Sequence, residues 1–135
     1  MDFKIRNEES KDIEQVEAIL RATFPTEAES KLVDALRAND KAIISLVAMN
    51  DDHALGHILF SPVSTAPSSE AKGIGLAPVA VLPEVQSQGI GSGLIGEGLR
   101  LCKELGYDCC FLFKKINIKI FHSWYIGYTQ IINST

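Results

Sequence analysis

The sequence predicts a mixed α/β fold of the α+β kind, with its elements in the order β-α-α-β-β-β-α-β. Two stretches near the start carry apolar residues three and four positions apart, which is typical of amphipathic helices. Three apolar segments rich in β-branched residues follow between residues 42 and 82, and turn-forming residues separate them. A third helical stretch then leads into one more apolar strand. We therefore expect a single mixed sheet flanked by helices.

The composition is that of a globular domain. The chain has 135 residues, of which 46% are hydrophobic and 22% are charged, and we expect one domain over residues 1–135. The net charge of −4 argues against a nucleic-acid partner, because nucleic acid is bound by a basic face. An acidic surface would instead attract a cationic amine.

The sequence also bears on location and on metals. It contains no apolar signal region and no apolar run of membrane length, so we expect no membrane partner and a cytoplasmic location. Three cysteines, two of them adjacent at Cys109 and Cys110, are typical of core thiols in a reducing compartment. No pair of cysteines or histidines has the spacing of metal ligands, and we expect no bound metal.

The first third of the chain predicts one strand and two helices. Residues 3–6 alternate between apolar and polar side chains, which indicates a short strand. Asp12 is a suitable cap for the first helix, and Pro25 ends that helix. Thr26-x-x-Glu29 has the pattern of a capping box at the start of the second helix. The apolar faces of the two helices consist of Ile13, Val16, Ile19, Leu20 and Phe24, and of Leu32, Val33 and Leu36.

The middle of the chain predicts three strands. Residues 42–49 and 54–63 are expected to form a hairpin around the turn at 50–52. Residues 64–73 are rich in Ser, Pro and Ala, and we expect a mobile surface connection there. The apolar run 74–82 contains two valines and is too short for a helix, so it predicts a buried strand.

A helix is predicted directly after this strand and a polar turn that begins at Pro83. It starts at glycines 89 and 91 and runs to about Leu105, with Gly106 as its C-terminal cap. Residues 107–113 then predict the last strand.

Two further glycines, Gly96 and Gly98, lie inside the predicted helix. Glycine in a helix interior costs up to about 1 kcal/mol relative to alanine. We expect close packing of the helix on the sheet to offset that cost at both positions.

Glycines at a helix N-terminus have a chemical meaning. The first N–H groups of a helix have no partner within it, and the helix dipole adds about half a positive charge there, so an anion binds without a cationic side chain. The absence of Cβ atoms at Gly89 and Gly91 lets a phosphate group approach the backbone. The sequence therefore predicts a diphosphate site.

One motif in this stretch is that of a nicotinamide dinucleotide site. Gly91-x-Gly93-x-x-Gly96 matches the glycine pattern, and Asp108 is a candidate for the acid that binds the ribose. The context does not fit, because Asp108 stands at the beginning of the next strand and not at its end. The unit also follows about 75 residues of the domain, whereas it normally opens one.

The second motif is Gln86-x-x-Gly89-x-Gly91, which directly follows the apolar strand and opens the helix. It resembles the acetyl-coenzyme A pyrophosphate loop of the GNAT N-acetyltransferase superfamily, whose pattern is Gln/Arg-x-x-Gly-x-Gly/Ala. A tight packing turn would explain the glycines alone, but the resemblance to the superfamily extends beyond this six-residue motif. It extends over Val79–Glu84, Gln88–Ile95 and Leu105–Asp108.

The resemblance implies a fold, a cofactor and a reaction. The sheet would splay after the fourth strand, and the pantetheine arm of acetyl-CoA would lie in the gap against the backbone of Val79, Ala80 and Val81. A strand N–H near Val81 would polarise the thioester carbonyl while a small-molecule or peptide amine attacks it directly. The pyrophosphate would be held by Gln86, Ser87, Gln88, Gly89, Ile90, Gly91 and Ser92.

The catalytic acid and base are not assigned by the sequence. Glu27 and Glu29 lie where the first two helices of the superfamily often line the acceptor pocket, although capping also explains Glu29. His57 stands among apolar residues, where a histidine is more often structural. Tyr125 and Tyr128 are the tyrosines available for the general-acid role, and a structural role is an alternative for each.

The resemblance covers residues 1–112 and breaks in the tail at 113–135. All 17 acidic residues precede that tail, which contains no alanine or proline either and resembles a truncated or substituted terminus with altered closing strands. A homodimer partner is one way to complete the acceptor pocket. The alternative function is therefore a CoA-binding GNAT-like domain with little or no catalytic activity.

Overall fold

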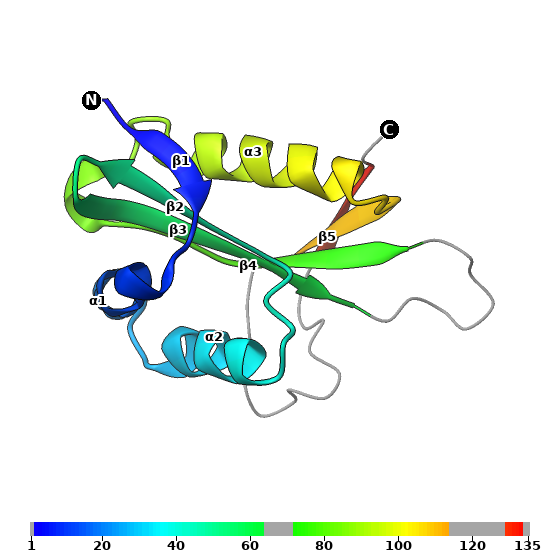
Figure 1. Ribbon diagram of the computed structural model, residues 1–135, viewed down its shortest axis with the longest axis horizontal. Coiled ribbons are helices and arrows are strands. Elements are labelled where there is room, and N and C mark those ends of the chain that lie inside the picture. Colours follow the sequence, from blue (N-terminus) through cyan, green and yellow to red (C-terminus); the bar gives the residue numbers. More distant parts are fainter. Residues whose placement is uncertain (1, 64–71, 114–128, 134–135) are drawn as a thin grey trace.

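The computed structural model describes residues 2–63, 72–113 and 129–133, and the elements follow the predicted order. One strand, β6, follows the last predicted element (Figure 1). The elements are β1 (Lys4–Asn7), the 3₁₀ turn η1 (Ser10–Asp12), α1 (Ile13–Thr23), α2 (Ala28–Ala38), β2 (Ile44–Asn50), β3 (His53–Pro62), β4 (Gly73–Val81), the 3₁₀ turn η2 (Pro83–Val85), α3 (Ile90–Glu104), β5 (Cys109–Phe113) and β6 (Thr129–Asn133).

The strands form one mixed sheet in the order β1-β2-β3-β4-β5-β6. All neighbouring pairs are antiparallel except β4 and β5, which are parallel because α3 connects them. Helix α3 covers one face of the sheet, and α1 and α2 cover the other (Figure 1). The predicted α+β class is thereby confirmed.

Side-chain alternation along the strands divides the core between the two faces. In β2, Leu46 and Ala48 pack with α3, whereas Val47 and Met49 pack with α1 and α2. The predicted apolar faces of α1 and α2 lie in this second cluster, with one exception. Ile13 is 38% exposed, because it lies at the first position of α1 and on its outer side.

The sheet parts between β4 and β5, as the resemblance implied. Pairing between the two strands runs from Gly73 with Cys109 to Leu76 with Leu112 and then stops. In the remainder of β4, residues 79–81 still pair with β3, but no strand that the structure describes lies along their other edge. The backbone of this segment is therefore open on one side.

The predicted cap at Asp12 is only half right. Asp12 holds the N-cap position of α1, yet its carboxylate makes no cap bond to that helix. It accepts hydrogen bonds from the Glu9 N–H at 2.7 Å and from both terminal nitrogens of Arg6, at 2.7 and 3.0 Å. Charge-assisted bonds to a guanidinium are stronger than a bond to a neutral N–H, and they turn the carboxylate back toward β1.

The predicted capping box at the start of α2 is wrong. The helix begins at Ala28, with Glu27 as its N-cap, so Thr26 stands one position too early to bond the third helical N–H. The Thr26 hydroxyl accepts instead from the Ala28 N–H at 3.2 Å. The Glu29 side chain is thus free of a capping role.

Helix α3 ends as predicted at Gly106. This glycine has φ of +88°, and its N–H donates to the Lys103 carbonyl at 3.1 Å while the Tyr107 N–H donates to Cys102 at 3.0 Å. The pair of bonds is a Schellman motif, which requires a left-handed residue at that position. Because the motif uses residues 106 and 107, β5 begins at Cys109 and not at the predicted 107.

The two glycines inside α3 have different surroundings. A Cβ on Gly98 would lie 2.2 Å from the Phe60 ring, so this glycine lets the helix contact β3. A Cβ on Gly96 would meet nothing within 4 Å, and Gly96 is exposed. The packing explanation is therefore confirmed for Gly98 and wrong for Gly96.

Other features fall partly outside the described residues. The predicted mobile connection at 64–73 lies outside them except for its last two residues, of which Gly73 begins β4. Within the described ranges, no helix is both long enough and apolar enough to cross a membrane.

Alanine substitutions at the two glycines should change stability in opposite directions. Gly98→Ala should lower the free energy of unfolding by about 1–3 kcal/mol or more, because the new methyl group overlaps the Phe60 ring. Gly96→Ala is the matched control and should raise stability by up to about 1 kcal/mol through helix propensity alone. Urea unfolding of both variants measures this difference, and equal effects would contradict the packing explanation.

Candidate functional site

A groove of about 380 Å³ lies where the open end of β4 meets the start of α3. Its walls come from three places: the last residue of α1, the end of β4, and the turn that leads into α3. None of the described residues that line it carries an acidic, basic or imidazole side chain. The lining residues are Thr23, Val79, Val81, Gln86, Ser87, Gly89, Ile90, Gly91, Ser92 and Ile95.

The turn before α3 reverses the chain within a few residues. Ser87 and Gly89 both have positive φ, of 65° and 87°, and Gly89 is the N-cap of the helix. Glycine adopts this conformation without a Cβ penalty, so conformation alone already favours Gly89. A Cβ on Gly91 would lie 3.8 Å from Cγ2 of Val81, which places the first turn of α3 against the end of β4.

The first turn of α3 presents unpartnered donors. The first intrahelical bond runs from the Gly93 N–H to the Gly89 carbonyl at 2.9 Å, so the N–H groups of Ile90, Gly91 and Ser92 precede the helical ladder. Gly89 has no side chain to cap them, and the first turn holds no acidic residue. These N–H groups and the positive end of the helix dipole therefore favour an anion at this end of the groove.

The strand wall adds backbone groups of its own. The Leu82 N–H donates to the Leu55 carbonyl at 2.9 Å, and antiparallel hydrogen bonding alternates along a strand. Ala80 is thus the next residue that bonds toward β3, and the N–H and carbonyl groups of Val79 and Val81 point to the opposite, open edge. A linear ligand can hydrogen-bond there as a neighbouring strand would.

One of these outward groups is already occupied. The Val81 carbonyl accepts a hydrogen bond from Nε2 of Gln86 at 3.0 Å and a second from the Thr23 hydroxyl at 3.3 Å. The two donors come from different elements, the turn before α3 and the end of α1. They fix the outward direction of the Val81 backbone.

This arrangement of a parted sheet and a glycine-rich helix start can be compared with known families. The family model described as the acetyltransferase (GNAT) family matches residues 13–119, which is most of the chain. The chain belongs to the GNAT family. The match begins with α1 and includes all of the groove.

Relatives and solved structures agree with the assignment. Escherichia coli K12 YhbS, named as an uncharacterized N-acetyltransferase, is 36% identical over 104 residues, which covers 76% of this chain and 62% of YhbS. The chain thus spans less than two thirds of the curated relatives it matches. The E. coli YhbS structure in complex with CoA superimposes with a TM-score of 0.83 at 27% identity, covering 98% of this chain and 82% of that one.

A second solved structure has a closer sequence. A GNAT family acetyltransferase from Brucella melitensis, in complex with acetyl-CoA, is 34% identical with a TM-score of 0.82. The superposition covers 98% of this chain and 88% of that chain. The GNAT fold of this chain is therefore shown by sequence and by structure.

Within this GNAT domain, the structure brings eight of the ten predicted cofactor residues to the groove. The two others lie elsewhere. The Ala80 side chain is buried on the opposite face of the sheet, against α1 and α2, and the exposed Gln88 does not line the groove. Two lining residues, Thr23 and Ile95, were not predicted, because neither belongs to the glycine motif.

The carboxylates predicted near the acceptor pocket differ from each other. Glu27 is exposed and lies 3.5 Å from Arg21 and 3.9 Å from Lys31 in ion pairs. Glu29 has one carboxylate oxygen, Oε1, that is buried and has no hydrogen-bond partner among the described residues. Tyr125 and Tyr128 lie outside the described residues, so their roles and the predicted dimer contact of the tail stay predictions.

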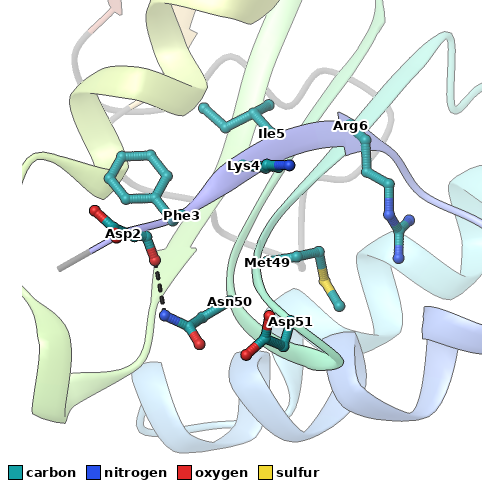
Figure 2. Close-up of a pocket in the computed structure, with 8 residues that line it drawn as sticks. All are labelled: Asp2, Phe3, Lys4, Ile5, Arg6, Met49, Asn50 and Asp51. Carbon is teal, nitrogen blue, oxygen red and sulfur yellow. Dashed lines mark hydrogen bonds between the residues drawn. The ribbon is translucent and has the colours of Figure 1, made fainter.

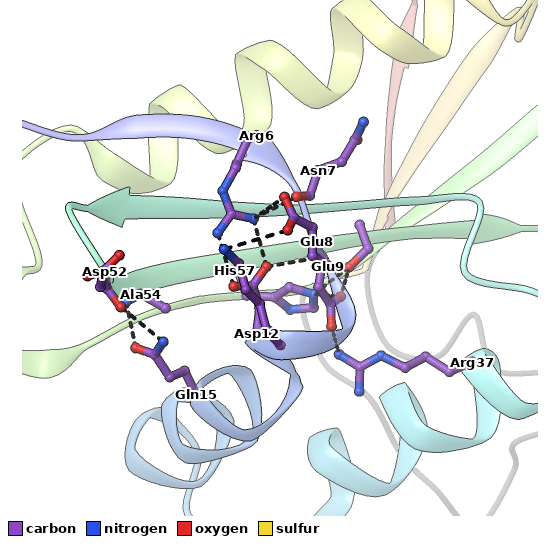
Figure 3. Close-up of polar contacts among 12 residues, drawn as sticks. Arg6, Asn7, Glu8, Glu9, Asp12, Gln15, Arg37, Asp52, Ala54 and His57 are labelled. Carbon is purple, nitrogen blue, oxygen red and sulfur yellow. Dashed lines mark hydrogen bonds and ion pairs between the residues drawn. The ribbon is translucent and has the colours of Figure 1, made fainter.

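The third candidate, His57, lies in a buried polar cluster (Figure 3). Its ring is 0% exposed, and Nε2 is 2.8 Å from the Ser45 hydroxyl and 3.5 Å from Oε2 of Glu8. Glu8 also bonds Ser45 and the Arg37 guanidinium of α2. His57 does not line the groove, although its strand pairs it with Ala80. These contacts give the ring a structural role between β2, β3 and α2.

Burial and charge oppose each other in this cluster. Burial lowers the pKa of His57, and this effect exceeds the opposing hydrogen bond and charge of Glu8. Burial alone would raise the pKa of Glu8, but the hydrogen bonds from His57 and Ser45 and the charge of Arg37 lower it below its ordinary value. The cluster therefore favours a neutral imidazole beside an ionised carboxylate.

A second hollow, of about 810 Å³, lies between β1 and the turn that joins β2 to β3 (Figure 2). The Asn50 side chain donates to the Asp2 carbonyl at 2.8 Å across it. No predicted site residue lines it. The described residues also contain no group of three or more histidine, cysteine, aspartate or glutamate side chains that could hold a metal ion.

The residues of the nicotinamide motif do not assemble a site. Gly93 lies close to the side chains of Ile5 in β1 and of Phe3 just before it, and Gly96 is exposed. The Asp108 carboxylate accepts from the Lys72 N–H at 2.7 Å at the start of β4. Only Gly91 of that motif lines the groove.

The lowered pKa of His57 predicts a loss of stability below neutral pH. An unfolded histidine titrates near pH 6.5, and the folded pKa lies below that value, so the unfolded state binds more protons between the two. This contribution is complete above about pH 6.5 and is lost as the pH falls toward the folded pKa, with a slope of up to about 1.4 kcal/mol per pH unit.

Urea unfolding between about pH 5 and 7.5 measures that slope. His57→Gln should show a shallower pH dependence than the wild type. Equal slopes in the wild type and His57→Gln would show that the buried ring does not titrate in this way.

Proposed function

We propose that this chain is an acetyl-CoA-dependent N-acetyltransferase whose acceptor is a small-molecule or peptide amine. The observation that carries the proposal is the groove, in which free N–H groups at the start of α3 adjoin the open edge of β4. The complexes of the Brucella melitensis protein with acetyl-CoA and of YhbS with CoA support the same ligand class.

The groove fits an elongated ligand with a diphosphate at one end. The N–H groups of Ile90, Gly91 and Ser92 would bind the diphosphate, and the backbone of Val79 and Val81 would bind the pantetheine arm. Among the described residues no cation lines the groove, so the helix dipole and these N–H groups would supply the attraction. Gln88 would then contribute only its backbone, and Ala80 would contribute neither its backbone, which bonds toward β3, nor its side chain, which is buried on the other face.

Acetyl-CoA would supply the acetyl group, which passes to the neutral amine while CoA leaves as its thiol. The outward N–H groups of Val79 and Val81 are the described donors that could stabilise a developing oxyanion on the thioester. A base must also remove a proton from the amine. Among the described carboxylates, Glu29 is the best candidate, because its buried Oε1 has no other hydrogen-bond partner.

A second candidate function is CoA binding without turnover. It is favoured by one observation, namely that no titratable side chain lines the groove among the described residues. The two functions differ in whether thiol is released. Incubation with acetyl-CoA and a panel of primary amines, followed by a thiol assay, should detect amine-dependent CoA release if the enzyme proposal is right. CoA binding without release with any amine would favour the second function.

The diphosphate role of the loop predicts a selective loss of affinity in Gly91→Val. The valine side chain would enter the groove and keep the diphosphate from the helix N-terminus, so acetyl-CoA binding should weaken by about tenfold or more. Gly91 is a better test than Gly89, whose positive φ makes any substitution strained. Calorimetric titration measures the affinity.

The matched control is Gly96→Val in the same helix. Its side chain would face open space, so this variant makes the same glycine-to-valine change in the same helix and leaves the groove unchanged. Its acetyl-CoA affinity should equal that of the wild type. Equal affinity in folded Gly91→Val would remove the loop from the proposal.

The base assignment predicts a difference between two neighbouring glutamates. Glu29→Gln should lower amine-dependent kcat by about 10²-fold or more, which is the usual contribution of a general base, and should leave the affinity for acetyl-CoA unchanged. Glu27→Gln replaces an exposed, ion-paired carboxylate and should leave both unchanged. Similar kcat values in the two variants would eliminate Glu29 as the base.

A further inference from the structure

We propose that Thr23 and Gln86 are positioning residues that hold the anion-binding turn against β4 through the carbonyl of Val81. The proposal rests on the proposed function, because it concerns the affinity of the same groove for CoA. It assigns a role to Thr23, which the glycine motif does not include. It also assigns to the Gln86 side chain a role inside the protein, in place of a direct contact with the cofactor.

The geometry starts from a carbonyl without a strand partner. Pairing of β4 with β5 ends at Leu76, and the alternation of bonds along β4 turns the Val81 carbonyl away from β3. In a continuous sheet, a neighbouring strand would satisfy that oxygen. Here the amide of Gln86 and the hydroxyl of Thr23 do so, at 3.0 and 3.3 Å.

These two bonds join three elements at one atom. Gln86 lies directly after η2 and precedes the positive-φ residue Ser87, so its bond fixes where the turn leaves the strand. Thr23 is the last residue of α1, so its bond fixes the strand end to the helix layer on the other face. The start of α3 then lies beside the strand end, where a Cβ on Gly91 would be 3.8 Å from Cγ2 of Val81.

The two bonds also change the electrostatics of the groove. An unpaired carbonyl oxygen carries a partial negative charge, which would repel a diphosphate at the neighbouring helix N-terminus. Donors from Thr23 and Gln86 compensate that charge, and they leave the N–H groups of the strand and the helix as the outward-facing dipoles. We call these two hydrogen bonds to the Val81 carbonyl the clamp. The clamp therefore favours anion binding without contacting the anion.

Isosteric substitutions test the clamp. Thr23→Val removes the hydroxyl and keeps the shape, Thr23→Ser keeps the hydroxyl, and Gln86→Met keeps the side-chain length without the donor. Thr26→Val is a matched control, because the Thr26 hydroxyl bonds only the nearby Ala28 N–H in the described structure. Each variant is titrated calorimetrically with CoA, and its urea midpoint is measured without ligand.

We expect Thr23→Val and Gln86→Met to weaken CoA binding by about fivefold to twentyfold, which corresponds to roughly 1–1.8 kcal/mol. Thr23→Ser and Thr26→Val should bind within about twofold of the wild type. The double variant should lose less than the product of the single losses, because both side chains act through one oxygen. A residue with only a structural role would shift the urea midpoint and leave CoA affinity unchanged.

Three outcomes separate the two proposals. Wild-type protein that is folded and does not bind CoA would overturn the proposed function. Wild-type binding with CoA affinities within twofold in both Thr23→Val and Gln86→Met would overturn the clamp alone. Loss of affinity in Thr23→Val with no rescue by Thr23→Ser would also overturn it, because the hydroxyl would then not be the responsible group.

Discussion

The structure depends on the parting of β4 from β5 after Leu76. Up to that residue the two strands share a parallel ladder, and beyond it β4 keeps only its bonds to β3. Backbone donors and acceptors of Val79 and Val81 are thereby directed into a gap instead of into a sheet. The end of the strand lies beside the first turn of α3, so that two sets of N–H groups without a partner among the described residues line one groove. We propose that this break in the sheet is the binding surface of the chain.

An open strand end must be held in place by the rest of the fold, and hydrogen bonds from polar groups contribute to this. On the groove side, Val81 is fixed by donors from α1 and from the turn. On the inner side, His57 of β3 pairs with Ala80 and is itself bonded within the Glu8 cluster (Figure 3). The strand that would carry the ligand is therefore supported by apolar packing and by buried hydrogen bonds.

The sequence predicts the site better where the signal is local. Gly89 and Gly91 follow an apolar strand and open a helix, so one short segment indicates both the turn and the anion site. Thr23 could not be found in this way, because a threonine at the end of an amphipathic helix has no distinctive pattern and its partner is 58 positions away. Gly96 and Gly98 show the same limit. Both are unfavourable in a helix interior, and they differ only in that Gly98 faces the Phe60 ring, which the sequence does not reveal. The closing strands were expected to be altered, but β6 could not be placed from the sequence, because the tail departs from the family pattern on which the order of the elements was based.

The central claim is that the groove holds an acyl-CoA by its diphosphate at the helix N-terminus. The most direct test is calorimetric titration of the wild-type chain with acetyl-CoA and with S-acetylpantetheine, which has the same thioester and arm but no diphosphate. The account predicts that acetyl-CoA binds with a dissociation constant in the micromolar range and that S-acetylpantetheine binds about 100-fold more weakly or not at all. Equal affinity for the two ligands, or no binding of acetyl-CoA by the folded chain, would contradict it.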